Sequence, residues 1–215
     1  MNIFWQGQTC FKIIVQKGKE GQVSILVNPY GKETGLRPPK VEADILILSD
    51  DSRKEVQGCG FLVAGPGEYD VKGVYIKGIP ALAKSTDPKN KKDKKKTTIY
   101  AIEAEDIRIC YLDNLGEEEL SSKELEDIGG ADILIVPVGG QDSLDAKGAI
   151  KVMSQIEPKI IIPMYYKIPG LKIKLDAVET FLKSLGIKTL EPVPKLSIKK
   201  KDIQEGEAKI IVLQP

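Results

Sequence analysis

Short apolar runs separated by turn residues open the chain. Residues 3–6, 11–16 and 23–27 each have the composition of a short strand, and the Lys-Gly-Lys-Glu-Gly sequence at 17–21 is typical of a turn. Strands joined by connections this short pair in an antiparallel way. The first 27 residues therefore predict an antiparallel meander.

The next segment is a buried strand that runs directly into a polar loop. Residues 45–48 are all apolar, whereas residues 49–55 all carry a hydroxyl group or a charge. A strand of this kind typically delivers a functional loop to the end of a sheet. Further strands are predicted along the chain at 60–64, 68–71, 74–81, 97–104 and 107–112.

Helices and strands alternate in the second half. A Ser-x-x-Glu capping box at Ser121 predicts a short helix that ends at Gly129. Residues 131–138 repeat the apolar pattern of 43–48 almost residue for residue, which indicates two related halves. Two amphipathic helices are predicted at 145–156 and 175–185. Two more strands, at 159–163 and 208–213, complete the α/β pattern.

Composition narrows the class of protein. The 215 residues are enough to bury a continuous core, and we predict a single domain over 1–215. No apolar run approaches the roughly 18 residues of a membrane helix, and no secretory signal is visible, so we expect a cytoplasmic protein without membrane association. The three cysteines are widely separated and suggest neither disulfides nor a zinc site. Histidine is absent, which removes the commonest zinc ligand and general base.

Lysines gather at 84–96, where seven lysines and two aspartates give a net charge of +5 in a chain whose net charge is +1. This Lys-rich segment has no periodicity, so we predict a mobile loop. It contains no arginine or aromatic residue to read or stack on bases, and a solvated loop is therefore preferred to a nucleic-acid-binding arm. Such an arm would depend on Lys91, Lys92, Lys94, Lys95 and Lys96.

Several motifs resemble those of the metallo-β-lactamase superfamily. Its members commonly begin with Gly-His-Ser-Cys-Phe and then Ile-Leu-Ile-Asp-Pro-Phe, and this chain has Gly-Gln-Thr-Cys-Phe at 7–11 and Ile-Leu-Val-Asn-Pro-Tyr at 25–30. Pro-Gly-Glu-Tyr at 66–69 and Gly-Ile-Pro-Ala at 78–81 are similar to the ascorbate-phosphate-lactonase-like branch. The resemblance implies an α/β fold, a four-layer αββα sandwich of two mixed β-sheets flanked by helices.

The resemblance also maps the metal ligands of the superfamily onto this sequence. The family pattern Thr-His-x-His-x-Asp-His corresponds to the polar loop at 49–55, and three further ligands correspond to positions after 81, in Asp-Asn-Leu-Gly at 113–116 and in Met-Tyr-Tyr at 164–166. The residues at these ligand positions are Asp50, Ser52, Lys54, Glu55, Ala83, Asn114 and Tyr165. None is the residue that the family uses.

These replacements predict a protein without metal, cofactor or catalytic residue, where the family would imply zinc or manganese. Lys54 adds a positive charge that opposes a divalent cation. We therefore expect a metal-free, catalytically inactive homologue that acts as a binding or structural module. We also expect a homo-oligomer, with an unknown protein or small-molecule partner.

Two alternatives remain open. A residual metal-dependent hydrolase would use non-standard oxygen ligands, such as a weak Mg²⁺ or Ca²⁺ site among Asp50, Asp51, Glu55 and Asn114. A nucleic-acid-associated protein would bind phosphates through the Lys-rich segment.

Overall fold

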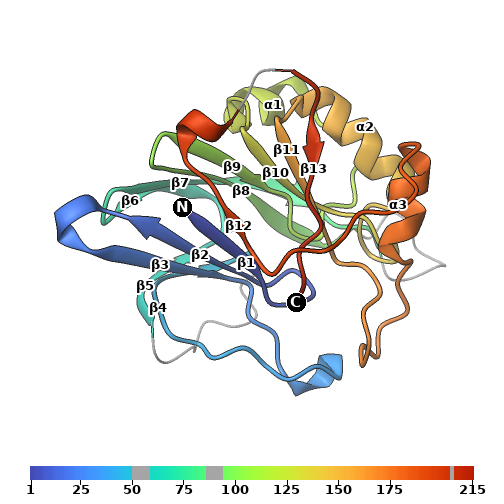
Figure 1. Ribbon diagram of the computed structural model, residues 1–215, viewed down its shortest axis with the longest axis horizontal. Coiled ribbons are helices and arrows are strands. Elements are labelled where there is room, and N and C mark those ends of the chain that lie inside the picture. Colours follow the sequence, from blue (N-terminus) through green and yellow to red (C-terminus); the bar gives the residue numbers. More distant parts are fainter. Residues whose placement is uncertain (50–58, 86–93, 204–205) are drawn as a thin grey trace.

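Two β-sheets pack face to face in the computed structural model, which describes residues 1–49, 59–85, 94–203 and 206–215 (Figure 1). The first sheet has the strand order β12-β1-β2-β3-β4-β5. Its strands are β1 (Asn2–Trp5), β2 (Phe11–Gln16), β3 (Gln22–Val27), β4 (Ala43–Leu48), β5 (Cys59–Ala64) and β12 (Leu196–Ser197). The pairs β1–β2 and β2–β3 are antiparallel, which confirms the predicted meander, whereas β3, β4 and β5 run parallel.

The second sheet has the strand order β13-β11-β10-β9-β8-β7-β6. Its strands are β6 (Gly67–Val71), β7 (Val74–Leu82), β8 (Lys96–Ala104), β9 (Ile107–Tyr111), β10 (Ile133–Pro137), β11 (Ile160–Met164) and β13 (Lys209–Ile210). Strands β6 to β9 pair antiparallel, and β9, β10, β11 and β13 run parallel. Both sheets are therefore mixed, as the sequence predicts.

Three α-helices lie on the outer side of the seven-stranded sheet (Figure 1). They are α1 (Ser122–Ile128), α2 (Ala146–Ile156) and α3 (Val178–Ser184), and short 3-10 helices lie at η1 (Gly18–Glu20), η2 (Lys32–Thr34) and η4 (Lys200–Asp202). The predicted capping box is present, because the side chain of Ser121 accepts a hydrogen bond from the Glu124 N–H. None of the helices in the described residues is long and apolar enough to cross a membrane.

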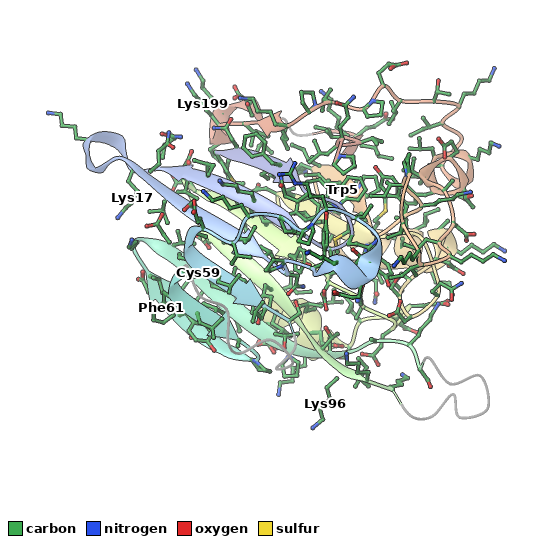
Figure 2. All side chains as sticks on the ribbon, turned by 90° about the horizontal axis from the view of Figure 1, so that it is seen from below. Trp5, Lys17, Cys59, Phe61, Lys96 and Lys199 are labelled. Atoms are coloured by element: carbon green, nitrogen blue, oxygen red, sulfur yellow. The ribbon has the colours of Figure 1, made fainter. Side chains whose placement is uncertain are left out.

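The burial pattern of each strand follows from what covers it. Strand β2 alternates buried and partly exposed residues, because one of its faces looks away from the sandwich. Strands β10 and β11 are buried at every position, since the sandwich core lies on one side and the helices on the other. Trp5 lies within the core (Figure 2), 1% exposed, with its ring centroid 4.6 Å from that of Tyr166.

Several element boundaries differ from the sequence prediction, and β12 is not predicted at all. Helix α3 begins at Val178 rather than 175, because Asp176 is held by backbone hydrogen bonds to Gly139 and Lys167 and Ala177 is extended, so Leu175 is buried outside the helix. The last strand is limited to Lys209–Ile210. Strand β8 begins at Lys96, so the end of the Lys-rich segment belongs to the sheet, while residues 86–93 lie outside the described residues.

Asp44 ties the start of β4 to two neighbouring elements. Its carboxylate accepts hydrogen bonds from the Ser24 N–H at 2.9 Å and hydroxyl at 2.8 Å, and Lys72 Nζ lies 2.5 Å away. The bond from Lys72, followed by those from Ser24, lowers the pKa of Asp44 from 3.8 to about 2. A carboxylate whose pKa is lower in the folded state stabilises the fold above its unfolded pKa and loses this effect as the pH falls toward its folded pKa.

Replacing Asp44 by asparagine should therefore destabilise the protein by about 1 kcal/mol at pH 7, since the carboxylate is partly exposed and its ion pair is screened. The difference between the two proteins should shrink as the pH falls from about 4 to about 2. Urea unfolding at several pH values measures it. A difference that stays constant over this range would show that the charge of Asp44 has no role.

Candidate functional site

A hollow of about 350 Å³ opens where the carboxyl ends of parallel strands from both sheets meet. We call it the cleft. It is lined by Gln8, Thr9, Asn28, Pro29, Tyr30, Glu33, Thr34, Leu48, Ser49, Lys95, Asp113, Asn114, Tyr165 and Ile173. In α/β proteins, ligands bind at the carboxyl ends of strands, which makes this the leading candidate for a functional site.

A hydrogen-bonded network joins the two sheets inside the cleft. Asn28 Nδ2 lies 2.7 Å from Asp113 Oδ1 and 2.9 Å from Ser49 Oγ. The second carboxylate oxygen of Asp113 accepts a hydrogen bond of 2.5 Å from the Thr97 hydroxyl. Asn28 and Ser49 follow strands of the six-stranded sheet, whereas Thr97 and Asp113 belong to or follow strands of the other. The network therefore fixes the two sheet ends relative to each other.

Four of the nine residues other than glycine that have positive φ angles in the described chain line the cleft. Gln8, Asn28, Asp113 and Tyr165 have φ angles of 54°, 44°, 47° and 51°, in the left-handed region that residues other than glycine rarely adopt. All four residues line the cleft. Strained backbone of this kind persists where the surrounding structure enforces it, and it clusters at binding and catalytic sites.

Two buried polar atoms of the cleft have no hydrogen-bond partner. They are Gln8 Nε2, a donor, and Asn114 Oδ1, an acceptor, and they are the two such side-chain atoms found in the described part of the chain. An unsatisfied buried polar atom costs about 1–3 kcal/mol, so it usually has a ligand, ion or water as its partner. The cleft thus offers one donor and one acceptor to a bound group.

Tyr165 stands where the family resemblance places a metal-binding histidine, but its chemistry differs. Its hydroxyl donates a 2.8 Å hydrogen bond to Asp142 Oδ1. Burial, and then the neighbouring Asp142 carboxylate, raise the pKa of Tyr165 far above its ordinary value. The phenol therefore acts as a hydrogen-bond donor to Asp142.

The structure brings together some of the sequence-predicted site residues. Asn114 and Tyr165 line the cleft. Ala83 is buried beside it, and its backbone packs against Gly116, two residues beyond Asn114. The remaining four positions, Asp50, Ser52, Lys54 and Glu55, lie outside the described residues.

Two residues of the network, Asp113 and Thr97, are absent from the sequence prediction. Asp113 precedes Asn114 in the motif that resembles the family, so the motif locates the right segment, and both of its polar residues line the cleft. Thr97 opens an apolar run and has no distinguishing sequence signal. The sequence identifies Asn28 and Gln8 only as replacements of a family Asp and His, yet both line the cleft.

Lysines of the Lys-rich segment that the structure describes are partly neutralised. Lys84 Nζ lies 3.7 Å from a carboxylate oxygen of Glu118, and Lys94 Nζ lies 3.3 Å from one of Glu117. The prediction of a solvated loop, with nucleic-acid binding as the less favoured alternative, is not tested by these contacts.

The sequence of this chain matches the profile of a known family. The match, described as a beta-lactamase superfamily domain, covers residues 2–165. The chain belongs to the beta-lactamase superfamily. Its α/β architecture of two mixed sheets also matches the metallo-β-lactamase sandwich, which confirms the predicted fold class.

Solved structures of this superfamily resemble the chain along its whole length. A protein from Thermotoga maritima, named as a candidate Zn-dependent hydrolase of the metallo-beta-lactamase superfamily, is 31% identical with a TM-score of 0.76, and the match covers 99% of this chain and 97% of that one. A metallo hydrolase from Ignicoccus hospitalis shares the fold, with a TM-score of 0.63 at 17% identity over 92% of this chain and 99% of that one.

Relatives are also found by sequence. A UPF0173 protein of Pyrococcus abyssi is 28% identical over 186 residues, which are 77% of this chain and 83% of the relative. A UPF0173 metal-dependent hydrolase of Carboxydothermus hydrogenoformans is 37% identical over 73 residues, which are 33% of this chain and 32% of that protein.

These comparisons overturn the prediction of a metal-free, catalytically inactive homologue. Relatives in this superfamily are named metal-dependent hydrolases, and the Thermotoga maritima structure is named as a candidate Zn-dependent one. The prediction was wrong because it gave the loss of histidine and the charge of Lys54 more weight than the oxygen donors that the sequence retains. Missing imidazoles exclude a histidine-built zinc site, but carboxylate and amide oxygens can also hold a divalent cation.

Proposed function

We propose that this chain is a hydrolase that depends on an oxygen-ligated divalent cation, Mn²⁺ or Mg²⁺, held in the cleft by Asn114 and Asp113. The observation that carries the proposal is the buried Asn114 Oδ1 without a hydrogen-bond partner. It stands where the resemblance places the carboxylate that bridges the metals of the superfamily. The names of the relatives support the same class of activity.

The donor set of the cleft decides which cation fits. A zinc site built from imidazoles does not fit, because the chain contains no histidine. Carboxylate and amide oxygens suit Mn²⁺ and Mg²⁺, and Asp113 and Asn114 supply one of each. The described residues contain no group of three or more His, Cys, Asp or Glu side chains that could hold a metal. Other predicted oxygen donors, Asp50, Asp51 and Glu55, lie outside the described residues.

Several polar groups in and beside the cleft have roles in this proposal. A bound divalent cation supplies Lewis-acid polarisation of a substrate carbonyl or phosphoryl oxygen. Gln8 Nε2 is available to donate a hydrogen bond to a substrate oxygen. Asn28 and Thr97 orient the Asp113 carboxylate through their hydrogen bonds to it. Asp142 orients the Tyr165 hydroxyl at the edge of the same cleft.

Changes at Asn114 test the proposal. Asn114→Leu removes the unpartnered acceptor and should weaken Mn²⁺ binding roughly tenfold or more, whereas Asn114→Asp adds a carboxylate at the same place and should strengthen it by a similar factor. Binding is measured by electron paramagnetic resonance titration of EDTA-treated protein with Mn²⁺. Hydrolysis of bis(p-nitrophenyl) phosphate and p-nitrophenyl butyrate is then followed with and without the metal. The metal-dependent rate should fall in Asn114→Leu and rise in Asn114→Asp, as the Mn²⁺ affinity does.

Asn2→Asp is the matched control. It adds the same charge on β1, where Asn2 hydrogen-bonds Ser197 far from the cleft, and should leave Mn²⁺ affinity unchanged. Equal affinities in all four proteins, or no stoichiometric Mn²⁺ or Mg²⁺ binding to the unmodified chain, would refute the site.

A further inference from the structure

A second, larger hollow of about 880 Å³ lies beside the cleft. We call it the side pocket. Ser49 and Lys95 line both hollows, so the two are adjacent. The side pocket is lined by Ser49, Gly65, Pro66, Pro80, Ala81, Leu82, Lys95, Lys96, Thr97, Thr98, Glu117 and Glu124. Its volume is in the range of sites that hold small organic ligands.

The apolar wall of the side pocket is held in place by a buried tyrosine. The Tyr100 hydroxyl donates a 2.6 Å hydrogen bond to the Leu48 carbonyl and accepts one of 3.0 Å from the Gly65 N–H. This fixes the turn that carries Pro66 against the end of β4. Gly78 allows the turn to pack closely, because a Cβ there would collide with the Gly65 carbonyl. The pocket is therefore preformed, with Pro66, Pro80 and Leu82 as its apolar surface.

The charged side chains around the side pocket differ in how they are paired. Glu117 is paired with Lys94 at 3.3 Å, and Glu124 accepts hydrogen bonds from Ser121 in the capping box of α1. Lys96, in contrast, forms no ion pair with any residue that the structure describes. Its side chain extends from the start of β8 into solvent (Figure 2). The pocket thus combines apolar walls with a positive charge that is available to a ligand.

We propose that the side pocket binds the apolar body of an organic anion, an ester or phosphodiester whose aromatic or branched group packs on Pro66, Pro80 and Leu82. Lys96 pairs with the negative charge, and Ser49 marks the point where the substrate passes into the cleft. This proposal rests on the proposed function for the identity of the reacting bond, but the binding that it describes does not require catalysis. The expected substrate is amphipathic rather than a sugar or a free phosphate, because a strongly hydrated ligand would not gain from the apolar wall.

Two fluorescent probes of the same shape separate the two parts of the proposal. 1-Anilinonaphthalene-8-sulfonate carries an aromatic body and a negative charge, and N-phenyl-1-naphthylamine carries the same body without the charge. Both are titrated against the full chain, with EDTA and again with Mn²⁺. We expect saturable binding of both, with the sulfonate binding more tightly, and this result does not depend on any hydrolytic activity.

Variants then assign the binding to the side pocket. Lys96→Gln should weaken binding of the sulfonate about two- to fivefold and leave the neutral probe unchanged, as expected for one exposed ion pair. Pro80→Trp fills the pocket and should weaken both probes at least tenfold. Leu82→Ser, a milder change that keeps the backbone of β7, should weaken both about threefold. Lys19→Gln, at the tip of the β2–β3 connection, is the control and should change neither.

The outcomes of the two proposals are separable. Sulfonate binding that is insensitive to Lys96→Gln, Pro80→Trp and Leu82→Ser would overturn the side pocket, whatever the metal experiment gives. Probe binding that follows these variants, in a protein that binds no Mn²⁺, would retain the pocket and refute the hydrolase.

Discussion

Replacing Asp113 by leucine should lower the free energy of unfolding by about 3–5 kcal/mol and abolish metal binding in the cleft. Leucine has nearly the same shape but offers no acceptor, so the Asn28 amide and the Thr97 hydroxyl would be left buried without one of their partners. Each buried donor left without an acceptor costs about 1–3 kcal/mol. Urea unfolding followed by circular dichroism measures the loss.

Asp113→Asn is the matched control for this change. It keeps one acceptor oxygen for Asn28, and the Thr97 hydroxyl can rotate to accept from the new amide, so the expected cost is about 1 kcal/mol. If the leucine and asparagine variants unfold at the same urea concentration, the network does not hold the sheets together as described.

Gly139→Ala should be nearly as damaging, at about 3 kcal/mol, and should displace Tyr165. A Cβ at position 139 would collide with the Tyr165 carbonyl and lie 3.0 Å from the Tyr166 Cα. The lone tryptophan reports the displacement, because the Gln8 carbonyl accepts hydrogen bonds from both Trp5 Nε1 and the Tyr165 N–H. The emission of Trp5 in the folded variant should therefore shift.

Gly130→Ala provides the comparison. Gly130 has a φ of 84°, and a methyl group added there would meet nothing within 4 Å, so alanine adds only backbone strain of about 1 kcal/mol. Its Trp5 emission should match that of the unmodified protein. If Gly139→Ala and Gly130→Ala lose the same stability, the contact of the new methyl group with Tyr165 contributes nothing to the loss.

The sequence predicts most of the fold because its signals are local. Apolar runs between turn residues locate most strands to within two residues, and the Ser121 capping box correctly places α1, whereas β12 is missed and β13 is shorter than predicted. The prediction fails where burial is not periodic. Leu175 fits the stripe of a helix, but it is buried by the tertiary packing against Gly139 while lying outside α3.

The candidate site is harder to predict, because its parts come from distant segments. The resemblance located Asn114 and Tyr165, since both stand at motif positions. The role of Thr97 depends on a contact with Asp113 across 16 residues, and only the pairing of β8 with β9 creates it. The functional prediction failed for a chemical reason: it preferred a metal-free protein, because histidine is absent and Lys54 is positively charged, over the oxygen-ligated alternative that the comparisons support better.

Because the Asn28–Asp113 hydrogen bond joins the two sheets, any redesign of the cleft also affects the stability of the protein. Asn28 and Asp113 belong to the cleft and also join the two sheets. Substitutions there that change the reactivity of the cleft therefore also lower the stability of the fold. Pro80 and Leu82, which form the wall of the side pocket, take no part in the network that joins the sheets. If the side pocket binds substrate as proposed, substitutions at Pro80 and Leu82 change its specificity without altering the hydrogen bonds between the sheets.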